Sequence, residues 1–348
     1  MKRTNSFGLL PALFMSLAFM QTGFQALHAQ EVKKVGTSAA AFLRIPVGAR
    51  GIAMGSAFAS IADDGSALFW NPGTAARLSR YTLFIHHSPW LPGLDHTYFG
   101  FTMPMASLGV LGIQVVSLQS EDMDITTLEA PMGTGETFNA ASTALGISFA
   151  RKLTDRFSIG ANVKFIQERI FHSNASGLAF DVGTLFNTPF KGIRLGVSVS
   201  NIGTRMRMSG EDLNAYVDVA PGQEGNNDEI VAQLNTDRFD LPIILRLGVS
   251  WDWRISDGSR LTFACDGVNP NDNGQSLNVG CEFAALKETV FLRAGFNELF
   301  LENREKGLTA GGGVQLPSGS RMKLALSYAY QDFQYLGAIN HFSVEIGF

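Results

Sequence analysis

Apolar residues alternate with small or polar residues along most of the chain from about residue 81 onward. In residues 193–200 every second side chain is apolar, and the run from Met322 to Tyr330 repeats the pattern. A period of two is that of a β-strand. A soluble sandwich would bury the apolar face against a second sheet. A transmembrane barrel turns that face to lipid and places small or polar groups in its lumen, which fits these strands better.

The alternation predicts about 14 strands, an even number. Every second connection between them is short, and the others are usually longer, as at 121–137, 204–236 and 299–306. Outer-membrane barrels combine short periplasmic turns with longer external loops, so we expect a transmembrane antiparallel β-barrel with both chain ends in the periplasm. The expected spans are 81–90, 96–105, 107–120, 138–153, 157–171, 177–190, 193–203, 237–253, 259–270, 275–286, 289–298, 307–317, 321–332 and 339–348.

The beginning of the chain has the pattern of a secretory signal peptide. Lys2 and Arg3 precede an apolar run from Phe7 to Met20, and Ala29 offers a small residue for cleavage. A membrane anchor is the alternative, but the run is short for a span, and no stretch of 18 apolar residues occurs in the sequence. We therefore predict a signal peptide at residues 1–29 and export to the outer membrane of a Gram-negative bacterium.

Residues 30–80 lack the alternation and precede the predicted barrel at 81–348. The part from Ala49 to Ala62 is rich in Ala, Gly and Met, which permits close packing, and it contains apolar residues at spacings that short helices use. A barrel of about 14 strands encloses a lumen wider than its own side chains fill. We expect a partly helical plug, or hatch, inside that lumen. A free periplasmic tail is the alternative, but the segment has too few polar residues for one.

Composition narrows the function classes. Charged residues make up 17 % of the chain, against roughly 25 % in soluble proteins. The net charge of −4 argues against nucleic acid as a partner, because phosphate binding needs a basic face. Two cysteines are too few for a disulfide scaffold. Cys265 and Cys281 lie symmetrically about Asn273, so they are either lipid-facing apolar residues or a cross-strand disulfide.

The sequence contains no recognisable catalytic or metal-binding motif. His86 and His87 are neighbours on a strand, so they point to opposite faces. His341, Ser343 and Glu345 would line the lumen together, but polar ladders are ordinary in barrel lumens. We predict that the protein is not an enzyme and that it uses no cofactor and no metal.

The last residues form a distinct signal. Phe342, Val344, Ile346 and Phe348 share one face of the final strand, and the chain ends on an aromatic residue. This resembles the terminal strand that the barrel-assembly machinery recognises in outer-membrane proteins. We expect that machinery and outer-membrane lipid as partners, and a chance strand at the chain end is the alternative.

Two stretches of the plug segment carry a family resemblance. Residues 36–57, GTSAAAFLRIPVGARGIAMGSA, and residues 61–73, IADDGSALFWNPG, resemble the opening of the PorV/PorQ family, within the FadL-like group of outer-membrane barrels. The family usually has Ala then Gly after the proline, whereas here Gly73 is followed by Thr74. Beyond this motif the resemblance concerns architecture and length.

The second stretch also has a local structural meaning. Asn71 before Pro72 is biased away from helix, so Phe69 to Gly73 should form a turn. Asp63 and Asp64 precede Gly and Ser, which suits a turn or a helix N-cap. Trp70 would anchor the turn against the barrel wall. These residues form either a ligand gate or partner contact, or a packing device that fixes the plug.

The resemblance implies a role in type IX protein secretion, in which the barrel binds the C-terminal sorting domain of cargo or the translocon. The candidate surface is the loop 204–236 together with 121–137 and 299–306. The alternative is a FadL-like channel for hydrophobic small molecules, with a moving plug and a phenylalanine-lined pocket. Acidic residues in the loops could bind calcium or a basic partner, or simply face solvent, and their spacing fits no EF-hand. They are Glu121, Asp122, Asp124, Glu129, Glu211, Asp212, Asp218, Glu224, Asp228 and Glu229.

Overall fold

The computed structural model describes residues 35–219, 222, 230–318, 322–334 and 336–348. The predicted signal peptide at residues 1–29 lies outside these residues, and so do Glu224, Asp228 and Glu229 of the predicted acidic loop.

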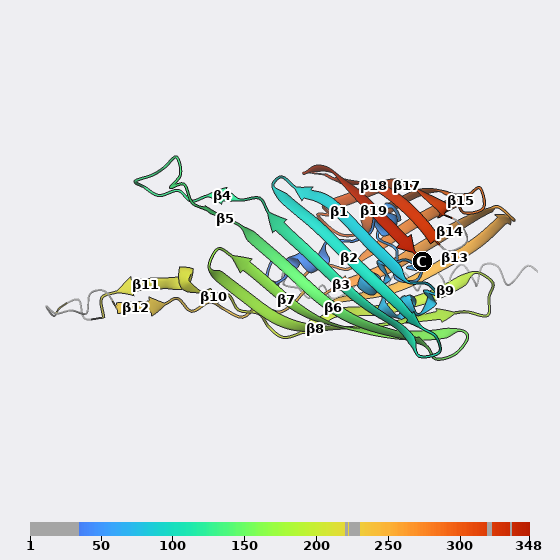
Figure 1. Ribbon diagram of the computed structural model, residues 1–348, viewed down its shortest axis with the longest axis horizontal. Helices are drawn as coiled ribbons and strands as arrows, with labels where there is room; N and C mark the ends of the chain where they lie inside the picture. The colour runs from blue at the N-terminus through green and yellow to red at the C-terminus, as the bar shows by residue number, and fades with distance from the viewer. Residues whose placement is uncertain (1–34, 220–221, 223–229, 319–321, 335) are drawn as a thin grey trace, which may run out of the picture. The chain divides into compact units, whose positions relative to one another are not determined.

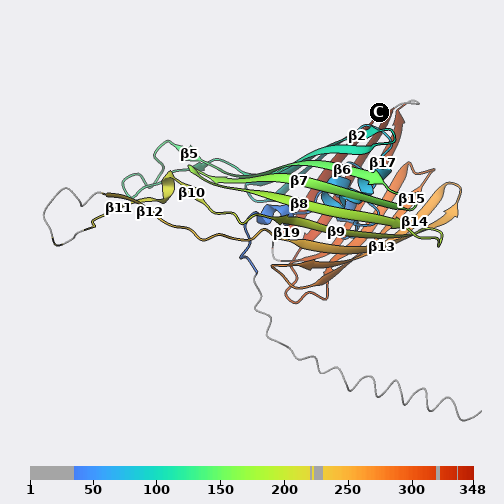
Figure 2. The ribbon, with the colours of Figure 1, turned by 90° about the horizontal axis from the view of Figure 1, so that it is seen from below.

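Fourteen strands of the described chain close into an antiparallel barrel (Figures 1 and 2). Consecutive barrel strands pair in chain order, and β1 pairs with β19 to close the ring. The predicted fold, a 14-stranded barrel around a partly helical plug, is confirmed. The barrel strands are β1 (Thr82–Leu91), β2 (Leu94–Met105), β3 (Gly109–Ser120), β6 (Ala140–Lys152), β7 (Phe157–Ile170), β8 (Ser173–Asn187), β9 (Ile193–Gly203), β13 (Ile244–Ser256), β14 (Ser259–Pro270), β15 (Ser276–Ala285), β16 (Val290–Leu299), β17 (Lys306–Ser318), β18 (Met322–Phe333) and β19 (Gly337–Gly347).

The two ends of the barrel differ in their connections. At the short-turn end, where both β1 begins and β19 finishes, no connection exceeds five residues. The long-loop end carries 121–139 and 204–243, and its other connections are also short. The two long connections contain β4 (Met123–Asp124), β5 (Thr137–Phe138), β10 (Ser209–Gly210), η3 (Glu211–Leu213), β11 (Asn214–Val217) and β12 (Ile230–Gln233).

Two predicted strand limits differ from the structure by four residues or more. The strand expected at 237–253 begins at Ile244, because Pro242 just before it cannot donate to a ladder. Phe239 instead bridges to Met206 in the same long connection. The strand expected from residue 177 begins earlier, at Ser173, where it pairs with β7 up to a two-residue turn.

The barrel wall is apolar outside and polar inside. Large apolar side chains such as Ile85, Phe149 and Leu247 are exposed on its outer face. Buried positions between them carry polar groups, for example Asn162 and Glu282. This inversion of the usual soluble pattern is that of a barrel whose outer face meets lipid.

Short helices form the plug, and they lie inside the ring of strands (Figure 2). They are η1 (Ala41–Arg44), α2 (Ala49–Ala53), α3 (Ala67–Trp70) and η2 (Pro72–Arg77). Val47, Ile52, Phe58 and Ala67 are fully buried. Among the described residues, no helix has the length and apolarity to cross a bilayer.

Pairs of glycines in the wall receive the backbone of the plug. Three glycine pairs face each other across neighbouring strands: Gly160 with Gly183, Gly196 with Gly248, and Gly280 with Gly295. A Cβ atom on Gly160, Gly196 or Gly280 would lie 2.3, 2.3 or 2.2 Å from the carbonyl oxygen of Pro72, Ala59 or Met54. Only glycine allows so close an approach of two backbones, so these pairs fix where the plug sits.

Candidate functional site

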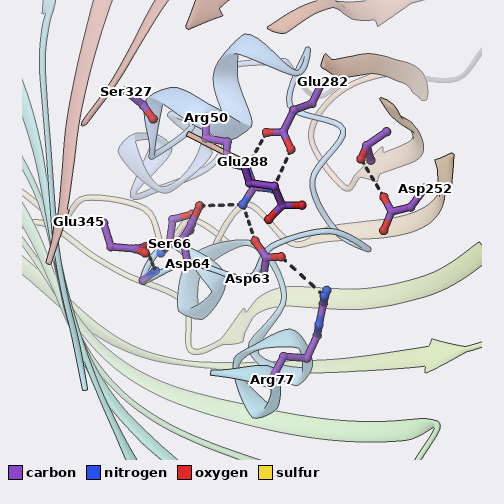
Figure 3. A network of polar contacts seen from close by, with 12 residues as sticks. Arg50, Asp63, Asp64, Ser66, Arg77, Asp252, Glu282, Glu288, Ser327 and Glu345 are labelled. Carbon is purple, nitrogen blue, oxygen red and sulfur yellow. Dashed lines mark hydrogen bonds and ion pairs between the residues drawn. The ribbon is translucent and has the colours of Figure 1, made fainter. Parts of the chain in front are cut away.

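A charged network joins the plug to the wall near the short-turn end (Figure 3). Arg50 of α2 donates from Nε and Nη2 to the two oxygens of Glu282 on β15, at 2.9 and 3.2 Å. Arg293 and Arg260 donate to the same carboxylate at 2.8 and 3.2 Å. The Glu282 side chain is fully buried. One carboxylate therefore holds three guanidinium groups, one from the plug and two from the wall.

Asp63 and Asp64 both face Arg50 in this network (Figure 3). Asp63 accepts a hydrogen bond from Arg50 and lies 3.6 Å from Arg77. Burial by itself raises the pKa of Asp63, but the two guanidinium groups outweigh it and hold that pKa well below its usual range. Asp64 accepts hydrogen bonds from the backbone and hydroxyl of Ser66, and burial raises its pKa. Asp64 therefore forms the expected turn, while Asp63 forms ion pairs.

Asn71 ties two parts of the plug to the wall. Its Nδ2 donates to the carbonyls of Ala59, at 2.7 Å, and Thr184 of β8, at 2.9 Å, while its Oδ1 accepts from Gly73 N. The residue is extended, as expected before a proline. The predicted turn over 69–73 was wrong, because α3 continues through Trp70 and Pro72 then begins η2. Proline is favoured at the first helical position.

Trp70 packs mainly inside the plug rather than on the wall. Its Nε1 donates to the carbonyl of Val47 at 3.0 Å, and its ring meets Phe58 and Phe69 edge to face. One contact with the wall comes from Arg246 of β13, whose guanidinium lies 5.5 Å from the ring centre. The hydroxyl of Ser198 on β9 also donates to the Trp70 carbonyl at 3.0 Å. The expected anchor against the wall therefore consists of this hydrogen bond and the cation–π contact.

A pocket opens at the long-loop end between the first plug residues and the wall. We call it the mouth pocket; its volume is about 320 Å³, within the range of about 300–1,000 Å³ typical of small-molecule sites. The plug supplies one side of it, β7 and β8 another, and the two arms of the long connection the third. It is lined by Gly36, Thr37, Ser38, Ala39, Glu168, Ala175, Met206, Met208, Thr236, Asp237 and Phe239.

The mouth pocket sits over an apolar core. Ala175 and Met206 are buried in one cluster with Phe42 and Leu43 of η1, and Met208 packs against it. The side of the pocket formed by the plug is held by hydrogen bonds. Ser38 donates to Asp272, and the Ala39 backbone N–H donates to the Asp240 carbonyl at 3.0 Å. Movement of residues 36–40 would therefore change the shape of the pocket directly.

Two smaller cavities also flank the plug. One, of about 80 Å³, is lined by residues that include Arg44, Trp70, Arg246 and Lys306. The other, of about 150 Å³, lies beside the charged network and includes Arg50, Glu288, Lys323 and Glu345. The second is lined largely by polar groups, so it suits water better than an apolar molecule.

Three histidines gather in the lumen. His86, His96 and His341 are fully buried, with ring centres 5.8 Å apart for His86 and His96 and 5.6 Å for His86 and His341. His87 is exposed on the other face, as the strand pattern predicts. Among the described residues, no group of three His, Cys, Asp or Glu side chains is placed to hold a metal ion.

His341, Ser343 and Glu345 line the lumen together, as predicted from their alternation. No hydrogen bond of the described residues joins them into a catalytic relay, and Ser343 instead accepts from the Ala49 backbone N–H at 3.3 Å. Glu345 accepts from the Gly65 backbone N–H at 3.2 Å and from Lys323 at 3.3 Å. Its position therefore supports the plug.

The final strand has the predicted two-faced form. Phe342, Val344 and Ile346 lie on the outer face of β19, and Phe348 follows the strand and stacks on Tyr81 at 5.9 Å.

Both cysteines are free and lie on the outer face. Cys265 pairs across the ladder with Val279, and Cys281 with Phe263. The hairpin of β14 and β15 is centred one residue before the midpoint of the sequence between the two cysteines. The cysteines are therefore diagonal rather than directly opposite, and diagonal neighbours are too far apart for a disulfide.

The acidic loop residues that the structure describes mostly contact different local partners rather than one another. Asp212 accepts hydrogen bonds from the backbone of His172 and the hydroxyl of Ser173, which attaches η3 to the end of β8. Asp122 accepts from Asn139 at 2.9 Å. These contacts order the loops locally.

Sequence reasoning missed Arg50 and the mouth pocket. Arg50 stands within a stretch of small residues, and nothing local marks its distant partner Glu282. The pocket had one sequence signal, the alternation Met206-Arg207-Met208 inside a segment interpreted as loop. Read as a strand, that alternation would have placed both methionines on one face.

Comparisons with known proteins support this architecture. The model of a family described as Uncharacterised protein family UPF0164 matches residues 16–212. No curated protein sequence matches the chain.

Several solved structures share the fold at low sequence identity. The toluene transporter TodX of Pseudomonas putida is 12% identical, with a TM-score of 0.53 over 86% of this chain and 96% of that chain. The CymD monoaromatic hydrocarbon channel is 14% identical, with a TM-score of 0.53 over 86% of this chain and 96% of that chain. A Pseudomonas aeruginosa FadL homologue is 13% identical, with a TM-score of 0.52 over 87% of this chain and 98% of that chain.

Proposed function

We propose that this chain, which belongs to the uncharacterised protein family UPF0164, is an outer-membrane channel for hydrophobic small molecules. The observation that carries the proposal is the mouth pocket. It combines a volume of about 320 Å³ with a buried apolar floor, and the plug forms one of its sides. The fold is shared with a toluene transporter and a hydrocarbon channel, which supports the same function class.

The proposal orients the barrel in the membrane. The short-turn end faces the periplasm and the long-loop end faces outward, so the mouth pocket meets molecules arriving from outside. Residues 1–29 act as the signal peptide, 30–80 as the plug and 81–348 as the barrel. Phe342, Val344, Ile346 and Phe348 present the signal for the barrel-assembly machinery. Asp63, Asp64, Trp70, Asn71 and Pro72 fix the plug, because their side chains contact the plug itself and the wall.

A cavity-filling variant tests the channel. The probes are toluene and 1-decanol, and their binding to the purified protein in lipid nanodiscs is measured by calorimetry. Ala175→Phe fills the pocket from a buried wall position, and we expect binding to weaken at least tenfold. Ala161→Phe, on the outer face of β7, is the matched control. Equal binding by wild type and Ala175→Phe, with both barrels folded, would exclude this pocket as the ligand site.

A second candidate function is the PorV-like role in type IX secretion. Two observations favour it. The motif at residues 36–73 resembles that family, and the long-loop end carries exposed apolar residues. Tyr216 and Val231 of the β11–β12 ribbon are 76% and 57% exposed. Figure 1 shows this ribbon beyond the ends of β7 and β8. Its partners would be cargo C-terminal domains or the translocon.

Deletion of the ribbon tests the second candidate. Residues 214–233 can be replaced by a short glycine linker, which leaves the parts of 204–243 that line the mouth pocket. The secretion role predicts a folded barrel that no longer releases cargo. Continued cargo release by this variant would show that the ribbon is not the binding surface.

A further inference from the structure

The mouth pocket contains acidic groups in addition to its apolar lining. Two carboxyl groups line it, those of Glu168 and Asp237. Among the described residues that line it, none is lysine or arginine. A ligand in this pocket therefore meets acidic groups and no basic group of the described lining.

Arginines are plentiful nearby, yet they point elsewhere. Arg205 and Arg207 alternate with Met206 and Met208, so the methionines take the pocket face and the arginines the other face. Arg205 pairs with Asp240 on that outer face at 2.7 Å. Arg169, next to Glu168, donates to Asn139 at 2.9 Å. The local fold thus keeps the neighbouring arginines out of the pocket, whose lining retains its two carboxyl groups.

Glu168 is held in position at the edge of the apolar floor. Its Oε2 accepts a hydrogen bond from the Ala40 backbone N–H at 3.2 Å, which links the wall to the plug. The residue is half-buried, and Ala175 and Met206 beside the pocket are buried. A carboxylate with reduced access to water interacts strongly with a charge placed next to it. It favours a cation or hydrogen-bond donor there and disfavours an anion.

We propose that the mouth pocket selects amphiphiles with a cationic or hydrogen-bond-donating head group over fatty-acid anions. The inference rests on the proposed channel function and names the substrate class of the same site. The apolar tail would occupy the floor formed by Ala175 and Met206, and the head group would face Glu168 and Asp237. We expect at least a tenfold preference for the amine over the carboxylate, which corresponds to 1.4 kcal/mol.

Three probes with the same tail test the proposal: decylamine, 1-decanol and decanoate. Their binding to the full-length mature protein is measured in nanodiscs of zwitterionic lipid near neutral pH, with empty nanodiscs subtracted. The expected order of affinity is decylamine, then 1-decanol, then decanoate. Glu168→Gln keeps the shape of the side chain and removes its charge, so it should reduce the ratio of amine to carboxylate affinity at least fivefold. Asp237→Asn, on an exposed loop position, should act in the same direction.

Glu129→Gln is the matched control, because Glu129 lies in the other long connection and does not line the pocket. It should leave the ratio unchanged. Decanoate binding as tightly as decylamine to the wild type would overturn the inference while leaving the channel function intact. An unchanged ratio in both folded pocket variants would also overturn it. Failure of all three probes to bind would instead remove the proposed function, and the inference with it.

Discussion

Replacement of Gly280 by alanine is the sharpest test of how the plug is seated. The new Cβ would lie 2.2 Å from the Met54 carbonyl oxygen, and its three nearest atoms all belong to the Met54 backbone. Ordinary contact begins at 3.4 Å. The plug must therefore retreat by about 1.2 Å, since a backbone cannot swing aside as a flexible side chain can.

The cost follows from what this retreat disturbs. Overpacking a close-packed site costs about 1–3 kcal/mol. The retreat also stretches two hydrogen bonds of buried Thr309, which accepts from Gly55 N at 3.1 Å and donates to Ala53 O at 3.2 Å. A buried polar group left without its partners costs about 1–3 kcal/mol. We expect the free energy of local plug opening to fall by at least about 2 kcal/mol.

Hydrogen exchange read by mass spectrometry measures this change directly. A loss of about 2 kcal/mol corresponds to roughly 30-fold faster exchange of the amides in residues 49–61. Gly312→Ala is the matched control, because its Cβ would meet only the Phe291 carbonyl oxygen at 3.4 Å. If Gly280→Ala exchanged no faster than Gly312→Ala in a folded barrel, the wall glycines would not be what seats the plug.

Two further predictions concern the charged network. Glu282→Gln should lower the free energy of unfolding by about 3–5 kcal/mol in a denaturant titration, because three arginines lose their shared buried partner. Glu288→Gln, at a side chain 54% exposed, should cost no more than about 1 kcal/mol; equal losses would contradict the argument. The lowered pKa of Asp63 means that its stabilising effect is present above about pH 4 and is lost as the pH falls further. When the pH is lowered from 7 to 3, the protease sensitivity of the plug should therefore rise less steeply in Asp63→Asn than in wild type. Identical pH profiles of the two proteins would refute this.

Much of the fold was predictable because it rests on local alternation. Each strand shows its two faces within its own ten or so residues, as Phe342 and Val344 do against His341 and Ser343. Two predictions failed where a single proline overrides that pattern. Pro242 delays β13, and Pro72 starts a new helix rather than closing a turn.

The candidate site was far less predictable. The sequence marked Asp63, Asp64, Trp70, Asn71 and Pro72 as a unit, and the structure brings them to the plug. Nothing in the sequence indicated that the partner of Arg50 is Glu282, 232 residues away. For the mouth pocket, the methionine alternation was the one sequence signal, and it does not show that Glu168 and Met206 meet residues 36–39 of the plug.

The sequence by itself determined a barrel with an apolar outer face, an even number of strands and an N-terminal segment that does not form strands, because each of these is a property of consecutive residues. Only the tertiary structure decided which wall glycines meet the plug, which carboxylate collects the arginines and which charges line the mouth pocket. These contacts depend on the register between strands and on how the plug packs in the lumen. Both are set by the closure of the whole barrel rather than by any one segment.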